Sequence, residues 1–284
     1  MSKVLIAGCG FVGERVAELF LDRGAEVFTL SRSLAHVPSG AHALRADLRD
    51  PEQLRDLPND LTRIVFCAGA DAHTEAAYRE TYVDASRHLL EALAPNGAKP
   101  AGQRYLFVSS TAVYEDLSGD WVNEETPTTP QRFPGRVLLE AEALVRELAP
   151  SSVVLRAAGI YGPGRASLVD AVRRGEARYA AGPPSFTNRI HREDCAAAIV
   201  HLLEASSTGG TYIAADDSPA DRREVLEWLA SRLGAPRPRP ASAGEVRARG
   251  GNKRCSNARL RASGFELRFP SFRDGYGHDL ALTP

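Results

Sequence analysis

Three glycines near the start of the chain have the spacing of a phosphate-binding loop. They follow an apolar run, residues 4–7, and precede apolar residues at helical spacing. In such a strand, turn and helix, the first glycine permits a tight turn, the second lets the backbone approach a pyrophosphate, and the third allows close packing. The helix amides then face the phosphates. A dinucleotide site is predicted, with a purely structural glycine turn as the alternative. The predicted contacts are Gly8, Gly10, Phe11, Val12 and Gly13.

The end of the next apolar run, residues 25–30, is predicted to set the choice of dinucleotide. An NAD-preferring site places Asp or Glu about 20 residues beyond the glycines, where it accepts hydrogen bonds from the ribose hydroxyls. This chain has Ser31, Arg32 and Ser33 there. A guanidinium flanked by two hydroxyls suits a 2′-phosphate, so NADP is favoured and NAD is possible. If Arg32 instead stacks on the adenine or lies in solvent, the preference stays open.

These loops need parallel strands to position them, and the chain alternates apolar runs with helical patterns as such a sheet requires. The pattern predicts a parallel sheet with the ligand at its carboxyl-terminal edge. The predicted strands are 4–7, 25–30, 42–45, 63–67, 104–108, 153–156 and 211–214. After the glycine loop, the predicted helices are 52–57, 74–94, 136–148, 195–204 and 221–233, with short ordered pieces near 178–180, 188–190 and 257–262.

Length and composition narrow the class of protein. The 284 residues suffice for one large α/β domain, with or without a smaller lobe. The 35 basic and 36 acidic residues balance, which argues against nucleic acid or a membrane surface as partner. The four cysteines are far apart without a CxxC pair, so neither a metal site nor a disulfide framework is expected. Without a signal peptide or a long apolar stretch, we expect a cytoplasmic protein.

Six segments, in order, resemble the extended and atypical short-chain dehydrogenase/reductase superfamily, in particular its NAD-dependent epimerase/dehydratase branch. They read GCGFVG, RADLRDP, VFCAGA, FVSSTAVY, LRAAGIYGPG and RIHREDCAAAI and are spread over most of the chain. The resemblance implies an α/β fold, namely a Rossmann doubly wound parallel sheet with a small C-terminal substrate lobe. We expect residues 1–158 to form the dinucleotide-binding core, 188–215 to return to it, and the remaining segments of 159–284 to form the lobe.

The resemblance also assigns roles to residues at the strand ends. By position, Asp47 and Leu48 are similar to the pair that contacts the adenine in the family. Asp47 could alternatively cap the adjacent helix. Ala68, Gly69 and Ser109 are similar to the residues that line the cofactor at the ends of the fourth and fifth strands.

The catalytic positions are where the chain departs from the family. The resemblance makes Ser110 the catalytic hydroxyl, but aligning Glu142 with the family's glutamate puts Pro134 at the catalytic tyrosine and Leu138 at the lysine. In the family that tyrosine moves a proton, and the lysine lowers its pKa. Proline and leucine can do neither. Tyr114 is the candidate substitute, and a packing role at the start of its loop is the alternative.

Other polar residues have weaker signals. His191 and Asp194 begin a predicted helix, where a structural role is favoured over one in a cleft. The run Glu124-Glu125-Thr126-Pro127 resembles the family's substrate-loop acid, although an exposed acidic turn explains it equally well. Four basic residues could clamp a phosphate of a nucleotide-sugar-like substrate or could be solvated surface: Arg247, Arg249, Lys253 and Arg254.

Two functions remain open at this stage. The first is an NADP-leaning oxidoreductase or epimerase-like protein acting on a small-molecule substrate that is polar and sugar-like or anionic. The missing Tyr/Lys pair motivates the alternative, a non-catalytic NADP(H)-binding sensor or regulatory scaffold. Helical stretches 74–94 and 136–148 lie where family members form dimer contacts, so the resemblance also implies a homodimer.

Overall fold

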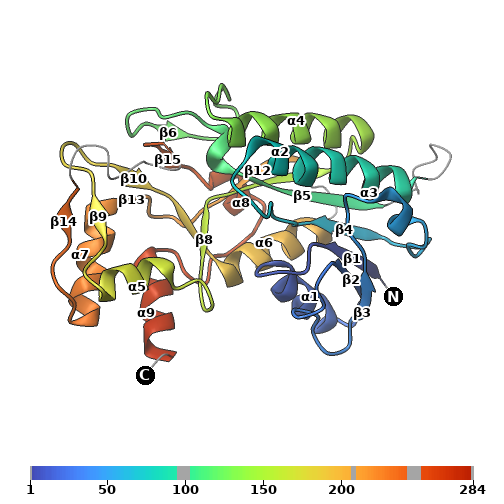
Figure 1. Ribbon diagram of the computed structural model, residues 1–284, viewed down its shortest axis with the longest axis horizontal. Coiled ribbons are helices and arrows are strands. Elements are labelled where there is room, and N and C mark those ends of the chain that lie inside the picture. Colours follow the sequence, from blue (N-terminus) through green and yellow to red (C-terminus); the bar gives the residue numbers. More distant parts are fainter. Residues whose placement is uncertain (1, 95–102, 206–208, 242–250, 283–284) are drawn as a thin grey trace. The chain divides into compact units, whose positions relative to one another are not determined.

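The computed structural model describes residues 2–94, 103–205, 209–241 and 251–282, which form two compact units (Figure 1). The first unit comprises the chain up to Val113, then Thr129–Arg156 and Cys195–Tyr212. The second comprises Tyr114–Thr128, Ala157–Asp194 and the chain from Ile213 onward. The segment Tyr114–Thr128, which the sequence-based division gave to the core, thus belongs to the second unit, and the returning segment is Cys195–Tyr212.

A seven-stranded parallel sheet forms the core of the first unit, as predicted. Its spatial order is β12-β7-β5-β4-β1-β2-β3, and Leu5 of β1 lies opposite Phe28 of β2 and Ile64 of β4. Chain order therefore reverses beside β1, and doubly wound sheets bind ligands at the carboxyl edge of such a reversal. The strands are β1 Lys3–Ala7, β2 Glu26–Ser31, β3 His42–Arg45, β4 Arg63–Phe66, β5 Arg104–Ser110, β7 Val153–Ala157 and β12 Gly210–Ala214.

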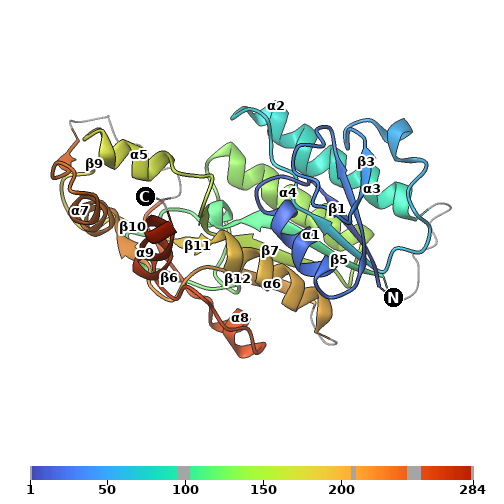
Figure 2. The same ribbon diagram turned by 90° about the horizontal axis from the view of Figure 1, so that it is seen from below.

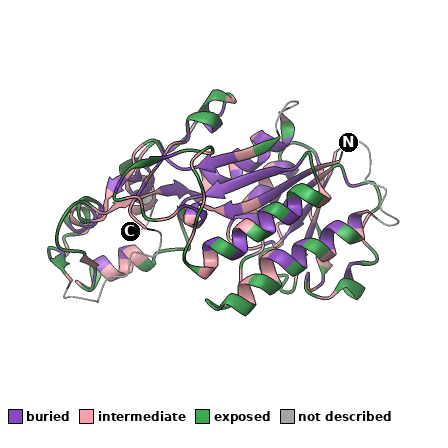
Figure 3. Ribbon diagram, turned by 90° about the horizontal axis from the view of Figure 1, so that it is seen from above, coloured by how far each residue is buried: buried purple, intermediate pink, exposed green. Residues whose placement is uncertain are grey.

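Helices cover both faces of this sheet (Figures 1 and 2). Figure 3 shows buried strands beneath helices whose outer sides are exposed. Because both faces are covered, β4 and β7 are apolar and buried along most of their length. One face carries α1 Gly13–Leu21 and α6 Arg192–Glu204; the other carries α2 Glu75–Tyr78, π-helical turns at Arg79–Asp84, α3 Ala85–Leu93 and α4 Phe133–Leu148.

The second unit has its own apolar core, in which Val172, Leu226 and Phe272 are almost fully buried. Those residues come from its three longer helices, α5 Ser167–Arg173, α7 Arg222–Leu233 and α9 Phe272–Leu282. Short helix α8 is Ala258–Ala262. Four two-stranded ladders complete the described part of the unit: β6 Trp121–Val122 with β15 Arg254–Cys255, β8 Gly159–Tyr161 with β11 Arg189–His191, β9 Arg178–Tyr179 with β14 Arg239–Pro240, and β10 Phe186–Thr187 with β13 Ala220–Asp221.

Most predicted elements are present, with corrections at their ends. The helix expected at 52–57 is a single 3₁₀ turn, Pro51–Leu54, whose first turn is capped by Asp50 accepting from the amide of Glu52 at 3.1 Å. The helices α5 and α9 and the short ladders β6/β15, β9/β14 and β10/β13 were not predicted. Within the described ranges, no helix is both long enough and apolar enough to cross a bilayer.

Candidate functional site

In the glycine loop after β1, backbone atoms of the protein pack directly against two of the three glycines and leave no room for a side chain there. Gly8 has a φ of +100°, and a Cβ there would lie 2.4 Å from the amide nitrogen of Ala68. A Cβ on Gly13 would lie 2.3 Å from the carbonyl oxygen of Gly8. Both distances are far below van der Waals contact, so these two glycines are required for α1 and the end of β4 to approach β1.

Gly10, the middle glycine of the loop, has open space among the described residues where a side chain would lie. Beyond its chain neighbours, nothing in the described part of the protein comes within 4 Å of the position that a Cβ on Gly10 would take. The loop leads into α1, which begins at Gly13, and the positive end of a helix dipole favours phosphate. A structural glycine turn explains Gly8 and Gly13 but leaves the open space at Gly10 unexplained. That space fits a pyrophosphate approaching the backbone.

Predicted cofactor residues of the neighbouring strands lie at the same edge of the sheet. Ala68 and Gly69 follow β4, and at Gly69 too no described atom beyond the chain neighbours lies within 4 Å of a Cβ position. Ser110 ends β5 and is half-buried, and its hydroxyl accepts a hydrogen bond from the amide of Ala112 at 3.2 Å. The hydroxyl of Ser109 is instead turned inward and is 2.7 Å from Glu142 Oε1. Any cofactor contact of Ser109 would therefore be made by its backbone.

Glu142 is the centre of a buried network in the first unit. Its carboxylate accepts from Ser109, from Arg156 Nε at 3.0 Å and Nη2 at 2.7 Å, and from Arg146 at 3.0 Å. Glu142 is completely buried, and Arg156 is 5% exposed. Removing one member of a buried ion pair costs about 3–5 kcal/mol, so this pair ties α4 firmly to β5 and β7. The sequence offered Glu142 only as a reference position and did not predict Arg156.

The ribose end of the site contains an ion pair that the sequence did not predict. Arg32 does not lie alone in solvent: it donates to both carboxylate oxygens of Asp71, at 2.6 and 2.5 Å. The hydroxyl of Ser31 donates to the carbonyl oxygen of Ser33 at 2.6 Å, and the Ser33 hydroxyl accepts from the amide of Ala35 at 3.3 Å. The two serines therefore shape the turn after β2.

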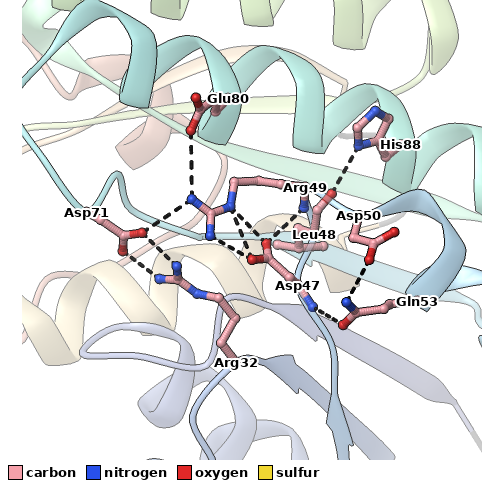
Figure 4. A network of polar contacts seen from close by, with 9 residues as sticks. All are labelled: Arg32, Asp47, Leu48, Arg49, Asp50, Gln53, Asp71, Glu80 and His88. Carbon is pink, nitrogen blue, oxygen red and sulfur yellow. Dashed lines mark hydrogen bonds and ion pairs between the residues drawn. The ribbon is translucent and has the colours of Figure 1, made fainter.

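Asp47 and Leu48, the predicted adenine contacts, lie next to the ion pair of Arg32 with Asp71 (Figure 4). Asp47 accepts from the backbone amide of Arg49 at 3.0 Å and from its Nη2 at 2.6 Å. These contacts with Arg49 lower the pKa of Asp47 to about 2, so the carboxylate is charged at neutral pH. Leu48 is buried, and its carbonyl oxygen lies 3.3 Å from His88 Nδ1. The cap of the following turn is Asp50, so Asp47 is not the helix cap considered from the sequence.

The candidate proton carrier Tyr114 is buried and hydrogen-bonded, and the two positions that replace the family's Tyr/Lys pair lie in α4. Tyr114, in the second unit, is 2% exposed, and its hydroxyl donates to the carbonyl oxygen of Asn123 at 2.8 Å. To carry a proton, Tyr114 would have to break this bond. Pro134 lies in the first turn of α4, and Leu138 is buried one turn further along. Neither side chain can transfer a proton.

Three acidic or basic candidates with a weaker signal have structural roles within the second unit. Asp194 accepts from two backbone amides of the segment before α9, at 2.7 and 2.9 Å, and burial raises its pKa. His191 Nε2 lies 3.2 Å from Asp279 Oδ1. Glu124 accepts from the amide of Ile213 at 2.8 Å and so holds its own loop.

The basic residues considered as a phosphate clamp are not available as a group. Lys253 is 1% exposed, and its ammonium donates to the carbonyl oxygen of Tyr114 at 3.1 Å. Arg254 donates from Nε to a backbone carbonyl at 2.7 Å. Arg247 and Arg249 lie outside the described residues. Of the four, the two that are described hold the second unit together.

Asp71 and Arg49 are the site residues that sequence reasoning missed. Arg49 directly follows the predicted adenine pair, and Asp71 comes two residues after Gly69 at the end of β4. Both residues lie in the segments that follow strands, Arg49 after β3 and Asp71 after β4, and this position is the signal that the sequence offers. Arg32 and Asp71 are 39 residues apart, and they meet because β2 and β4 flank β1, a fact that requires the strand order.

A sheet whose chain order reverses beside β1, with an open glycine loop at that point and polar residues on the adjoining strand ends, defines a Rossmann-type dinucleotide-binding protein. The chain belongs to the NAD-dependent epimerase/dehydratase family, whose sequence pattern matches residues 4–215. It is accordingly an NAD(P)-binding protein of the oxidoreductase and epimerase type, and the predicted family and fold class are confirmed.

Similar proteins span nearly the whole chain. Protein YeeZ of Escherichia coli is 31% identical over 95% of this chain and 97% of its own length. A 3-diazoavenalumate denitrifying reductase of a Streptomyces species is 28% identical over 98% of this chain and all of its own. A solved structure assigned to the NAD-dependent epimerases/dehydratases, from Methylobacillus flagellatus, is 38% identical with a TM-score of 0.80, over 99% of this chain and 98% of that one.

Proposed function

We propose that this protein is an oxidoreductase that leans towards NADP(H) and reduces a small polar substrate. The open space at Gly10 carries the proposal, because packing explains Gly8 and Gly13 but not Gly10. Arg32 supports the preference for NADP(H), since a planar guanidinium can bind two oxygens of the 2′-phosphate at once. NAD(H) can use the same loop, which binds the pyrophosphate that both dinucleotides share.

The class of substrate follows from the missing proton carrier. When bound, the nicotinamide supplies a hydride to an electron-poor centre of the substrate. Reduction of an ordinary ketone also needs a proton for the developing alkoxide, and a positioned acid normally supplies it. Pro134 and Leu138 cannot do so, and the Tyr114 hydroxyl donates to a backbone carbonyl. We therefore propose a cationic or strongly electron-poor acceptor, held against the Ser110 hydroxyl, whose product takes any proton from water.

The description of one relative supports this class of acceptor. The Streptomyces relative is a 3-diazoavenalumate denitrifying reductase. A diazonium group is cationic, and when a hydride replaces it the group leaves as dinitrogen, so the reaction requires no acid from the protein. A substrate of that electronic character would explain why a member of this family can lack the Tyr/Lys pair.

The test is oxidation of NADPH and NADH by the purified protein with diazonium salts, activated carbonyl compounds and sugar nucleotides. We expect turnover with a cationic or electron-poor acceptor. Tyr114→Phe is expected to keep kcat within about twofold of the wild type, because loss of a general acid would lower it by about 10²–10⁴-fold. A loss of that size would show that Tyr114 supplies the proton after all.

Tight NADPH binding without turnover of any acceptor would favour the second candidate, a non-catalytic sensor or scaffold. The absence of tyrosine and lysine at positions 134 and 138 is the observation that motivates it. We further propose a homodimer that uses the outer faces of α2–α3 and α4, the position suggested by the family resemblance. Sedimentation equilibrium of the purified protein tests this assembly.

A further inference from the structure

The cation expected to bind a 2′-phosphate already holds an anion of the protein. Arg32 Nη1 lies 2.6 Å from Asp71 Oδ2, and Arg32 Nη2 lies 2.5 Å from Asp71 Oδ1 (Figure 4). This is the two-pronged geometry in which arginine binds either carboxylate or phosphate. The contact with Arg32 lowers the pKa of Asp71, so Asp71 is charged at neutral pH.

A second arginine of the same cluster is also neutralised. Arg49 donates to both oxygens of Asp47, and its Nη1 lies 3.7 Å from Asp71 and 3.7 Å from Glu80 (Figure 4). The two guanidinium groups thus face three carboxylates, and the cluster carries a net negative charge. An incoming phosphate gains little from such a cluster until one carboxylate releases its guanidinium.

Strand order places this ion pair beside the glycine loop. Arg32 follows β2 and Asp71 follows β4, and both strands flank β1, whose carboxyl end carries the loop. The end of β2 is where a Rossmann protein meets the adenosine ribose, so Asp71 reaches the position that a 2′-phosphate would need.

We infer that Asp71 is an internal competitor of the 2′-phosphate and sets the choice between NADPH and NADH. The inference rests on the proposed dinucleotide-dependent function. A phosphate can take both donors of Arg32 only after Asp71 has released them, because two anions cannot accept the same pair of N–H groups. NADH has a hydroxyl in place of the phosphate and leaves the ion pair intact. Asp71 therefore reduces the difference in affinity between NADPH and NADH that Arg32 alone would give.

Exposure of the pair makes this exchange feasible. The side chains of Arg32 and Asp71 are 50% and 51% exposed. Exposed ion pairs are weak because water and salt screen them, so Asp71 can move from Arg32 into solvent or towards Arg49. For the same reason, the competition is worth about three- to tenfold in affinity.

The test compares the binding of NADPH and NADH to the wild type and to Asp71→Asn by titration calorimetry at low ionic strength. Asparagine keeps the size of the side chain and removes its charge. NADPH is expected to bind the variant about three- to tenfold more tightly, and NADH to bind within about twofold of the wild type. Asp60→Asn is the matched control, since exposed Asp60 pairs at 2.7 Å with Lys3, which begins β1 at the opposite edge of the sheet.

Several results would overturn the inference. They are unchanged or weaker binding of NADPH to Asp71→Asn, an equal gain for NADH, or the same gain in Asp60→Asn, which would indicate a general charge effect. If the wild type binds both dinucleotides and Asp71→Asn leaves their ratio unchanged, only the role of Asp71 fails. If the wild type binds neither dinucleotide, the proposed function fails as well.

Discussion

Asp216 is a buried carboxyl of the second unit that is not fully satisfied by the described residues around it. Its Oδ1 accepts from the amide of Ser218 at 3.1 Å, whereas its Oδ2 has no hydrogen-bond partner among them. Burial raises the pKa of Asp216 to about 7, and the nearby carboxylates of Asp217 and Asp194 act in the same direction. The amide of Ser218 and the charge of Arg189 only partly oppose this rise.

Stability is therefore predicted to depend on pH through this residue. The folded pKa of Asp216 lies above its ordinary value of 3.8, so its contribution is complete below about pH 4 and is lost as the pH rises through about 7. Between pH 5 and pH 8, Asp216→Asn should gain on the order of 2 kcal/mol in free energy of unfolding relative to the wild type. Urea unfolding at the two pH values measures this.

The neighbouring residue provides the control for that experiment. Asp217 is exposed, and Asp217→Asn can still accept from the side chain of Asn257, as the carboxylate does at 2.7 Å. Because burial, and not the charge of Asp217, is the main cause of the raised pKa of Asp216, Asp217→Asn should still lose stability between pH 5 and pH 8, as the wild type does. If Asp216→Asn loses stability to the same extent, the raised pKa is wrong.

The role of a single residue could be predicted where residue type and position after a strand were sufficient to assign it. Gly8, Gly10 and Gly13 are recognisable from spacing because each glycine has a distinct steric task. The partner of Arg32 could not be predicted, because Asp71 reaches it only through the order of the strands. The same is true of Arg156, whose buried pairing with Glu142 leaves no periodic signal in the sequence.

At the scale of elements, helix α9 forms although its sequence has a low helix propensity, because its residues are packed in the core of the second unit. It contains Gly275 and Gly277, and each glycine lowers helix propensity by about 1 kcal/mol, which is why the sequence did not predict a helix there. A Cβ on Gly275 would lie 1.9 Å from the hydroxyl oxygen of Tyr161, whereas the nearest described atom to a Cβ on Gly277 belongs to Trp228, at 4.0 Å. Close packing therefore requires the first glycine but not the second.

The same substitution should have opposite effects at these two positions. Gly275→Ala is predicted to lower the free energy of unfolding by about 1–3 kcal/mol through overpacking against Tyr161. Gly277→Ala is predicted to raise it by up to about 1 kcal/mol, because alanine favours the helix and meets open space. Urea unfolding of both variants at one pH measures the difference, and equal effects would refute the packing role of Gly275.

Other element boundaries differ from prediction for local reasons. Helix α4 begins at Phe133, three residues before the predicted start, because Pro134 fits the first turn, where no amide hydrogen is needed. The predicted helix 74–94 contains π-helical turns at Arg79–Asp84. A change of this kind alters the hydrogen-bond ladder while leaving the apolar pattern helical, so the sequence does not show it.

At the scale of the whole molecule, alternating apolar runs and helical patterns were sufficient to predict a parallel sheet, and the family resemblance implied that the sheet is doubly wound. Right-handed connections limit the possible strand orders, but they do not decide which strands flank β1. The division into units was harder to read, because Tyr114–Thr128 enters the second unit through the two-residue ladder of β6 with β15. Residues paired there, such as Trp121 and Arg254, are too far apart in sequence for a local pattern to reveal.

Binding of NADPH and NADH to the wild type and to Gly10→Ala, with thermal unfolding measured alongside, tests most directly whether the glycine loop holds a dinucleotide. No described residue beyond the chain neighbours comes within 4 Å of a Cβ there, so the variant should unfold within about 2 °C of the wild type. It should nevertheless bind both dinucleotides at least about tenfold more weakly, because the methyl group takes the place of the pyrophosphate. Equal affinity in the two proteins, or a wild type that binds neither dinucleotide, would contradict a dinucleotide site at this loop.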